Sequence, residues 1–333
     1  MRVTLKDVAA RAGVSRSAVS RTFTEGASVS AEKRRRIERA AAELGYAPSA
    51  LATGLSTGRT KLIGLVSNNF HNPIFLEIFD LFTRELQDRG LRPLLVNLSD
   101  ETDPMNSVRM LRQYSVDGVI VASSTLPPSF AAHFREADIP TVHSFGRVGC
   151  TPNVHVVGVD NEDCGKIAAR TLVARGYTSI AFLGGPRNAT STIDRLKGFL
   201  DEANRSSGLR VSTRFASAYT FDAGRKEMKS ILAAGEPAEA YFCGDDVLSI
   251  GALSALTEAG FSVPQDVGLL GLNDMEMARW QNINLSTIRQ PVPEIIDASV
   301  DLIAESVAEP AVKPEARIYP CRIIERGTLR PLP

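Results

Sequence analysis

The strongest constraint on the fold lies in the first 23 residues, where a glycine separates two short amphipathic patterns. In the first pattern, apolar residues recur at the spacing of one helix face, at Leu5, Val8, Ala9 and Ala12. Thr4 stands at the N-cap position, and Asp7 three residues later makes an acidic version of the capping box. Gly13 ends this helix and Ser15 can cap the next one.

The second helix separates apolar from polar residues. Its expected buried residues are Val14, Ala18, Val19 and Phe23. The residues left outside are basic or carry hydroxyls, namely Arg16, Ser17, Ser20 and Arg21. Two short helices joined by a tight glycine turn, the second with such an outward face, predict a helix-turn-helix.

A structural helix pair with solvated arginines is the alternative, and charge weighs against it. Residues 1–61 hold 12 Lys and Arg against 5 Asp and Glu, whereas residues 62–333 hold 26 against 33. The net charge of the whole chain is zero. A basic head on an acidic remainder favours a phosphate-binding surface at the head.

A third helix and a linker follow. Ser30 is a good N-cap, and the apolar spacing from Ile37 to Leu44 continues until Gly45 stops the helix. The basic run at residues 33–36 wraps around this helix, so solvation and phosphate contact are equally open for it. Residues 49–60 are rich in small residues, with a possible helix only at 50–55. Six residues do not hold a helix alone in water, so this segment should be disordered, or helical only when a partner stabilises it.

From residue 61 onward, strand-length apolar runs alternate with helical patterns. The expected strands are residues 62–67, 93–98, 118–122, 141–144, 154–159, 180–183, 216–219, 240–243 and 267–272. The expected helices are residues 75–89, 104–114, 164–175, 192–204, 223–233, 247–259 and 294–308. This alternation predicts an α/β body with parallel sheets. About 270 residues is long for one open sheet, so two subdomains are expected, with a ligand cleft where their strand ends meet.

Several classes of function have no support in the sequence. No apolar stretch reaches membrane-spanning length, and the N-terminus lacks the apolar core of a signal peptide, so a cytoplasmic protein is expected. The cysteines and histidines show no metal-ligand spacing, and no phosphate-binding glycine loop or nucleophile–base set is present. We therefore expect no metal, no cofactor and no enzymatic activity. The scattered cysteines fit reduced thiols.

Ordered motifs along the whole chain resemble the lac repressor (LacI/GalR-type) family of bacterial transcription regulators. In the head and linker they are residues 4–9 (TLKDVA), 12–15 (AGVS), 19–21 (VSR), 29–32 (VSAE), 44–48 (LGYAP) and 57–60 (TGRT). In the body they are residues 63–66, 72–75, 117–120, 159–161, 180–185, 195–199 and 285–291. The resemblance implies a helix-turn-helix head, a hinge helix, a periplasmic-binding-protein-like body and a homodimer that binds a near-palindromic operator. Repression is the family default, because an occupied operator blocks polymerase.

The resemblance also implies domain boundaries. The all-α helix-turn-helix head should span residues 1–48 and the hinge 49–60. The α/β body at 61–330 should divide into subdomain N, about 61–160 plus 291–320, and subdomain C, about 161–290 plus 321–330.

The chain departs from the family pattern at several positions. The family usually has threonine at Ala18, asparagine at Ser49 and a polar or charged residue at Phe145. The usual hinge sequence Arg-Ser-Leu is Thr53-Gly54-Leu55 here, and a family aspartate is Asn273. We expect a less stable hinge and a somewhat less acidic, more apolar ligand pocket.

Candidate DNA-binding residues follow from the helix-turn-helix and the resemblance. Arg16 and Ser17 should contact base edges in the major groove, and Arg21 a guanine or the adjacent phosphate. Thr4, Ser15, Ser20 and Ser30 should bind phosphates through hydroxyls and helix N-termini, although a plain surface hydroxyl is the alternative for Ser20. In the hinge, Ala52 and Leu55 are the candidates, with Leu55 as a wedge in the minor groove.

Candidate effector-binding residues lie at or just beyond predicted strand ends, or in loops that match the family's ligand positions. They are Asn68, Asn72, Phe75, Ser123, Phe145, Arg195, Phe221, Asp245, Asn273 and Gln290. Hydrogen-bonding groups beside aromatic rings favour a small polar metabolite, a sugar or sugar derivative. For Ser123 and Phe145, packing alone is an equal alternative.

Two other classes of function are alternatives to a DNA-binding regulator. A sugar-transport binding protein would share the body, but the basic head and the missing signal peptide argue against it. An enzyme on the same body lacks the residues for chemistry. The helices at 75–89 and 104–114 are expected to form the main dimer contact. The last residues, 329–333, show no heptad pattern that would join dimers into a tetramer, so a dimer is expected.

Overall fold

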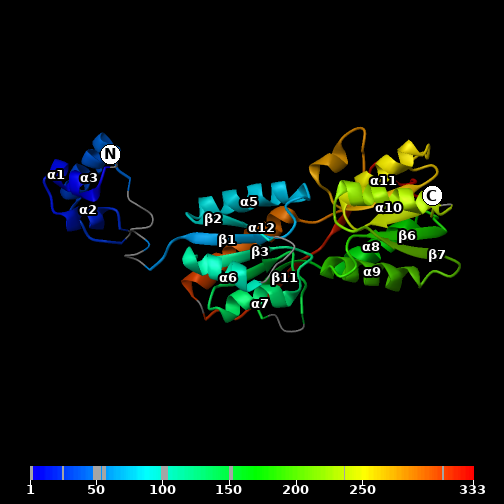
Figure 1. Ribbon diagram of the computed structural model, residues 1–333, viewed down its shortest axis with the longest axis horizontal. Coiled ribbons are helices and arrows are strands. Elements are labelled where there is room, and N and C mark those ends of the chain that lie inside the picture. The colour runs from blue at the N-terminus through cyan, green and yellow to red at the C-terminus, as the bar shows by residue number, and fades with distance from the viewer. Residues whose placement is uncertain are drawn as a thin grey trace. The chain divides into compact units, whose positions relative to one another are not determined.

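The computed structural model describes residues 3–24, 26–47, 54, 58–98, 104–149, 153–235, 237–309 and 311–333. The chain divides into two compact units, Met1–Lys61 and Leu62–Pro333 (Figure 1). The fold class expected from the sequence, a helical head plus a two-subdomain α/β body, is confirmed.

The head consists of α1 (Leu5–Ala12), α2 (Arg16–Thr22) and α3 (Ala31–Leu44). Val8, Val19 and Ile37, one from each helix, are completely buried and form its centre. The turn between α1 and α2 depends on Gly13, whose φ of 63° places it in the left-handed region that glycine tolerates best.

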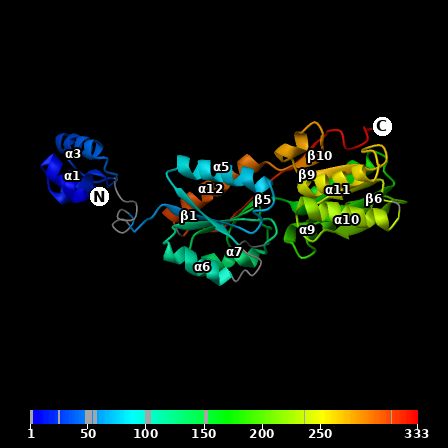
Figure 2. The same ribbon diagram turned by 45° about the horizontal axis from the view of Figure 1, so that its top comes forward.

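The N lobe of the body is a parallel sheet in the order β11-β5-β4-β3-β1-β2. Its strands are β1 (Leu62–Ser67), β2 (Arg92–Asn97), β3 (Gly118–Ala122), β4 (Thr141–Ser144), β5 (His155–Val159) and β11 (Ala316–Tyr319). Its helices are α5 (Ile74–Asp88), α6 (Pro104–Gln113), α7 (Pro128–Glu136) and α12 (Val292–Ala308). Alternate residues of β1 face opposite layers: Ile63 and Leu65 pack with α5 and α12, and Val66 with α6 and α7 (Figure 2).

The C lobe repeats this plan in the order β12-β10-β9-β8-β6-β7, and only the β10–β12 pair is antiparallel. Its strands are β6 (Ser179–Gly184), β7 (Arg210–Phe215), β8 (Ala240–Cys243), β9 (Gly268–Asn273), β10 (Ser286–Arg289) and β12 (Arg322–Ile324). Its helices are α8 (Asn161–Val173), α9 (Thr190–Ala203), α10 (Phe221–Ala233), α11 (Asp246–Glu258) and the short 3₁₀ helix η1 (Glu276–Arg279).

Close helix contacts in the C lobe require glycine. A Cβ at Gly198 of α9 would lie 1.8 Å from the Glu162 carbonyl oxygen of α8, and one at Gly251 of α11 would lie 2.2 Å from the Phe221 carbonyl oxygen of α10. The pairs α8–α9 and α10–α11 therefore approach backbone to backbone on the two faces of the sheet (Figure 1).

The chain crosses between the lobes three times. The first crossover joins β5 to α8, the second joins β10 to α12, and the third joins β11 to β12. In the described parts of the chain, no helix has the length and apolar composition that a membrane crossing needs.

Some expected elements differ from those observed. The strand expected at residues 216–219 is wrong: the strand is β7 (Arg210–Phe215), whose residues alternate between exposed and half-buried. The sequence patterns also missed α7 and the three short strands β10, β11 and β12.

Candidate operator interface and effector cleft

The outward face of α2 carries the predicted base-reading residues. Arg16, Ser17, Ser20 and Arg21 are all exposed. The Ser15 side chain caps the helix: its Oγ accepts from the Ala18 amide at 3.3 Å and lies 2.9 Å from Ser17 Oγ. Within the described part of the chain, Arg16 and Arg21 have no acidic partner at ion-pair distance. Their guanidinium groups are therefore available for an external anion or base.

Two arginines of the basic run at residues 33–36 have internal partners instead. Arg34 Nη1 donates to the Thr22 carbonyl oxygen at 2.9 Å, and Arg36 Nη2 donates to the Ala12 carbonyl oxygen at 2.6 Å. Both carbonyls lie at helix C-terminal ends, where cations are favourable. Lys33 and Arg35 are exposed, so the run is divided between helix capping and a solvent-facing surface.

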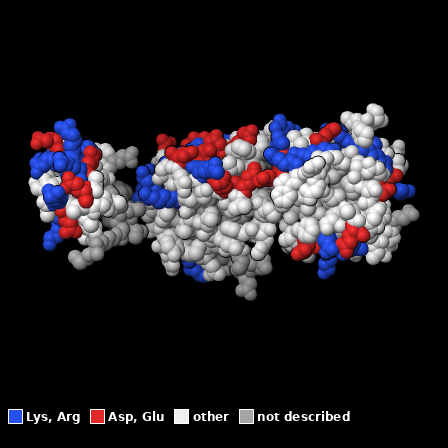
Figure 3. Space-filling view, turned by 90° about the horizontal axis from the view of Figure 1, so that it is seen from above, with Lys and Arg blue, Asp and Glu red and all other residues white. Residues whose placement is uncertain are grey.

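The other predicted DNA contacts lie at helix starts or outside the described residues. Thr4 at the start of α1 is exposed, and its hydroxyl and amide donate to Asp7 Oδ2 at 2.7 and 2.8 Å. These hydrogen bonds lower the pKa of Asp7. Ser30 is exposed at the start of α3, whereas Ala52 and Leu55 lie outside the described residues. Lys and Arg side chains are prominent on the visible face of the head (Figure 3).

A small cavity of about 30 Å³ lies between the two lobes of the body. Seven of the ten predicted effector residues line it, namely Asn72, Phe75, Phe145, Arg195, Asp245, Asn273 and Gln290. Asn273 ends β9, and the others come from loops and early helix turns that follow different strands, as expected for a site at the carboxyl ends of parallel strands. Sequence reasoning missed the other lining residues, which are Asn69, Ile74, Ile78, Ser124, Tyr219 and Val292.

Asp245 joins the lobes at the centre of this cavity. Its Oδ2 accepts from Asn72 Nδ2 of the N lobe at 2.9 Å and from Asn273 Nδ2 of the C lobe at 2.8 Å. Its Oδ1 accepts from the Val247 amide at 2.7 Å. Asp245 is 5% exposed, and burial raises the pKa of its carboxyl group to about 6. The carboxylate is a preorganised acceptor for polar groups in the cleft.

Arg195 supplies the positive charge of the cleft. It is 3% exposed, and its Nε donates to Asn161 Oδ1 at 2.8 Å while Nη1 donates to the Gly244 carbonyl oxygen at 2.6 Å. Among the described residues no carboxylate lies within ion-pair distance of it. Gln290, which donates to Asn273 Oδ1, completes the polar lining.

Three predicted effector residues do not line the cavity. Ser123 Oγ donates to Asn68 Oδ1 at 2.9 Å, and Asn68 Nδ2 donates to Thr125 Oγ1 at 3.0 Å, so both residues belong to a hydrogen-bonded loop network of the N lobe. Phe221 is 38% exposed at the start of α10. Tyr219, two residues earlier, lines the cavity instead. The correct end of β7 would have placed Tyr219 in the loop beyond a strand, where ligand residues are expected.

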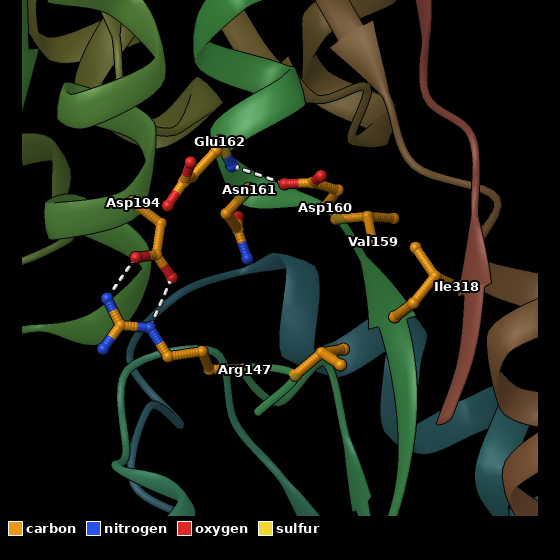
Figure 4. Close-up of a pocket in the computed structure, with 8 residues that line it drawn as sticks. Arg147, Val159, Asp160, Asn161, Glu162, Asp194 and Ile318 are labelled. Atoms are coloured by element: carbon orange, nitrogen blue, oxygen red, sulfur yellow. Dashed lines mark hydrogen bonds and ion pairs between the residues drawn. The ribbon is translucent and has the colours of Figure 1, made fainter. Parts of the chain in front are cut away.

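A second cavity, of about 370 Å³, opens beside the first crossover (Figure 4). Arg147 of the N lobe and Asp194 of α9 form an ion pair across it, with Arg147 Nε 2.8 Å from Asp194 Oδ2. Figure 4 shows the Asn161 side chain pointing into this cavity. Asn161 also accepts from Arg195, so this residue lines the second cavity and contacts a residue of the effector cleft.

Sequence and structure comparisons agree with this architecture. Residues 4–49 match the model of the bacterial regulatory proteins, lacI family, and residues 169–329 match a periplasmic binding protein-like domain. The ribose operon repressor of Escherichia coli (strain K12) is 30% identical over 98% of this chain and 99% of its own length. The HTH-type transcriptional repressor PurR of Escherichia coli O139:H28 is 31% identical over 98% and 96%.

This chain belongs to the lacI family of bacterial regulatory proteins. A crystal structure of the lac repressor dimer bound to operator and the anti-inducer ONPF is 26% identical, covers 98% of this chain and 99% of its own, and superimposes with a TM-score of 0.88. A complex of the transcriptional regulator CelR with cellobiose is also 26% identical, covers 98% and 100%, and has a TM-score of 0.72.

Membership confirms the function expected from the sequence. The chain is a DNA-binding transcriptional repressor whose body responds to a small-molecule effector, and the family is not one of enzymes. The α2 face and the interlobe cavity are the parts of the structure that suit these two tasks.

Proposed function

We propose that this lacI-family repressor acts as a homodimer on a near-palindromic operator and that a neutral sugar or sugar derivative, bound between its lobes, controls it. The observation that carries the choice of ligand is the composition of the interlobe cavity. One buried guanidinium, Arg195, and one buried carboxylate, Asp245, balance in charge, and amides and aromatic rings surround them. Such a lining suits an uncharged ring with several hydroxyl groups.

The chemistry of each cavity wall supports this ligand class. Asp245 and the amide groups of Asn72, Asn273 and Gln290 can accept from or donate to hydroxyls, and Arg195 offers donors from the opposite side. Phe75, Phe145 and Tyr219 can cover the apolar face of a ring. Two similar proteins carry sugar names, the ribose operon repressor and the CelR–cellobiose complex. The free volume of about 30 Å³ means that a ligand of this size enters only when the lobes separate.

On the head, we propose the DNA contacts named from the sequence. Arg16 and Ser17 contact base edges and Arg21 a guanine or phosphate, while Thr4, Ser15, Ser20 and Ser30 bind the backbone. Support comes from the exposure of these side chains and from the lack of an ion-pair partner for either arginine within the described residues. Since operator DNA lies with the chromosome, we place the protein in the cytoplasm.

We further propose the division of the chain into a head at residues 1–48, a hinge at 49–60 and a body at 61–330. In this proposal the hinge helix at 50–55 forms only on operator DNA, with Ala52 and Leu55 in the minor groove. An effector that changes the spacing of the two N lobes in the dimer pulls the hinges apart and releases the DNA.

The proposed dimer contact is the outer face of the N lobe along its edge strand β2, where α5 and α6 flank the strand from opposite sides of the sheet. Leu76 of α5 is 80% exposed, Met105 of α6 is 43% exposed, and Leu95 on the edge strand β2 is 49% exposed. Apolar side chains that are exposed together on one part of the surface, rather than singly, are a mark of a protein interface. Trp280, 48% exposed beside η1, lines a surface hollow of about 720 Å³ together with Leu76, so the same face extends onto the C lobe.

A ligand screen tests the effector proposal. The full-length protein is screened by thermal shift against neutral sugars, sugar phosphates and planar nitrogen heterocycles, and each hit is measured by calorimetry. We expect a neutral sugar to bind the wild type and to lose at least tenfold in affinity in Arg195→Ala, while the exposed control Arg214→Ala binds as the wild type does. If only a heterocycle or an anionic sugar phosphate binds, or if Arg195→Ala binds the sugar unchanged, the proposal is wrong.

A further inference from the structure

Two cysteines from distant parts of the chain meet at the crossovers between the lobes. Cys164 Sγ lies 3.4 Å from Cys321 Sγ, although 157 positions separate them in the sequence. Cys164 is in the first turn of α8, directly after the first crossover, and Cys321 lies in the third crossover between β11 and β12. Both are free thiols in this structure.

The two thiols differ in their surroundings. Cys164 is 1% exposed, and the hydrogen bond to Cys321 together with burial raises the pKa of its thiol. Cys321 is half-buried and lines a cavity of about 540 Å³ that also contains Arg289, Arg322 and Glu294. Reactive cysteines typically lie in partly exposed places near cationic groups. Cys321 is therefore the thiol that a small oxidant can reach, and Cys164 is the protected thiol behind it.

We propose that Cys164 and Cys321 form a reversible oxidation site, in which a small hydroperoxide entering the adjacent cavity converts the pair into a disulfide that ties the first crossover to the third. A disulfide needs an Sγ–Sγ distance of about 2.05 Å, so the sulfurs must approach by roughly 1.4 Å from their present contact. Rotation about the side-chain torsions of two cysteines can supply a shift of this size.

The chemistry has two steps, and the hydroperoxide is the oxidant. The Cys321 thiolate attacks the distal oxygen of the peroxide, the O–O bond breaks, and Cys321 sulfenic acid and an alcohol (water, from hydrogen peroxide) are formed. The Cys164 thiol then loses its proton and attacks the Cys321 sulfur, the S–O bond breaks, and water leaves. Two thiols lose two electrons and two protons in total, and the peroxide takes them up.

The position of the bond gives it a mechanical consequence. Cys321 is flanked by β11 of the N lobe and β12 of the C lobe, and Cys164 belongs to a C-lobe helix that begins at another crossover. The second crossover borders the same cavity through Gln290 and Pro291, and Gln290 also lines the effector cavity. A covalent link here restricts the segments about which the lobes would rotate.

The test measures the bond itself and needs neither operator nor effector. The full-length protein carries Cys150→Ser, because Cys150 lies outside the described residues, and it is compared with the same protein carrying Cys164→Ser or Cys321→Ser. Each is treated with hydrogen peroxide, alkylated, digested and analysed by mass spectrometry. Cys243, which is fully buried with its pKa raised by burial to about 12, serves as an internal thiol that should stay reduced.

We expect the treated protein to lose the mass of two hydrogens, to yield a peptide pair linked through Cys164 and Cys321, and to return to its original mass with a dithiol reductant. Cys164→Ser should stop at a Cys321 sulfenic acid that dimedone traps, and Cys321→Ser should leave Cys164 unmodified. The linked form should also unfold at a higher temperature, since the bond closes a long loop, with no such shift in Cys321→Ser. Absence of the linked peptides, or further oxidation of Cys321 while Cys164 stays free, would overturn the proposal.

Discussion

The arginines of the head fall into two groups according to what they contact. Arg34 and Arg36 donate to carbonyl oxygens at helix ends, and Arg11 and Arg39 pair with Glu43. Arg16, on the exposed face of α2, has no acidic partner among the described residues. A count of basic residues could predict the charge of this head, but it could not separate the arginines that stabilise the fold from those left for DNA.

Replacement of Arg16 by alanine should therefore relax the DNA sequence preference at particular operator positions, at a cost of about 1–3 kcal/mol. The matched control is Arg39→Ala, which removes the same charge from the head but from a side chain already paired with Glu43. Binding to a randomised operator library gives both the preferred sequence and the affinity. An unchanged preferred sequence in Arg16→Ala, or the same change in Arg39→Ala, would refute the assignment.

The buried Asp246 beside the cleft should make stability depend on pH. Burial raises its pKa from the usual 3.8 to about 7. Between these values the folded protein retains a proton that the unfolded chain has lost, so stability falls as the pH rises through this window. Asp246→Asn does not titrate, so its free energy of unfolding relative to wild type should rise by roughly 2–4 kcal/mol from pH 4 to pH 7.5.

The pH slope separates this effect from the hydrogen bonds that asparagine also disturbs. The Asp246 carboxyl group accepts from Thr287 Oγ1 at 2.6 Å and from the Met275 amide at 2.9 Å. Because asparagine does not titrate, any hydrogen bonding that Asp246→Asn loses lowers its stability by the same amount at every pH, and the slope reports the titration of Asp246 in the wild type. Urea unfolding across the pH range measures the slope, with exposed Asp88→Asn as control. A pH-independent difference between Asp246→Asn and wild type would show that Asp246 does not titrate in this window.

At the level of whole elements, the sequence predicted best what is buried on both sides. Central strands such as β1 and β3 are continuous apolar runs, and their bounds were predicted exactly as observed. The edge strand β7 reads RVSTRF, in which Arg210, Ser212 and Arg214 are exposed, so no apolar run marks it. The same error affects the predicted effector site. Because residues 216–219 after β7 are predicted as a strand, Tyr219 is absent from the predicted cavity lining.

The central strand β10 (Ser286–Arg289) was missed for another reason. Ser286 and Thr287 are buried there with their hydroxyls hydrogen-bonded, the Ser286 hydroxyl accepting from the Arg326 amide and the Thr287 hydroxyl donating to Asp246. Polar residues become acceptable in a core only through such partners, and the partners are distant in sequence. Asn72 and Asp245 could be predicted because they follow recognised strands, whereas no strand-end pattern marks Ile78 or Val292, which helix packing brings to the cavity.

Gly54 should lower the stability of the proposed hinge helix. Gly54 has no left-handed φ, and a Cβ there would lie 3.4 Å from its nearest neighbours, which is ordinary contact. Gly54→Ala should favour a helical hinge by about 1 kcal/mol, equivalent to about a fivefold gain in operator affinity for each hinge. It should also weaken the response to effector.

Gly149→Ala is the matched control, because a Cβ at Gly149 meets nothing within 4 Å and the residue lies in the body. In the same affinity measurement, Leu55→Ala should weaken binding to operator far more than binding to unrelated DNA. If Leu55→Ala binds the operator as tightly as the wild type does, Leu55 is not a wedge in the minor groove, and the switch that the effector controls lies outside the hinge.

For the whole molecule, the proposed dimer would link the operator to the cleft, since a near-palindromic site requires two heads related by a two-fold axis. Light scattering should give a mass near twice 35.9 kDa. Leu76→Asp, at the 80% exposed position on α5, should give a monomer with weakened operator binding, whereas Leu332→Asp, 55% exposed near the C-terminus, should remain dimeric. A monomeric wild type at micromolar concentration would contradict the dimer, and a dimeric Leu76→Asp would move the interface to another face.

We propose that occupancy of the interlobe cleft sets the affinity of the head for its operator, and one titration measures this coupling. Full-length protein is titrated onto the operator selected from a random DNA library, with and without the sugar identified by thermal shift, for wild type and Asp245→Asn. We predict that the sugar changes the operator Kd of the wild type by at least about fivefold, in the range of ordinary allosteric coupling. Asp245→Asn should bind the operator but respond little to the sugar. An operator affinity that is the same with and without every ligand that binds the wild-type body would contradict the account.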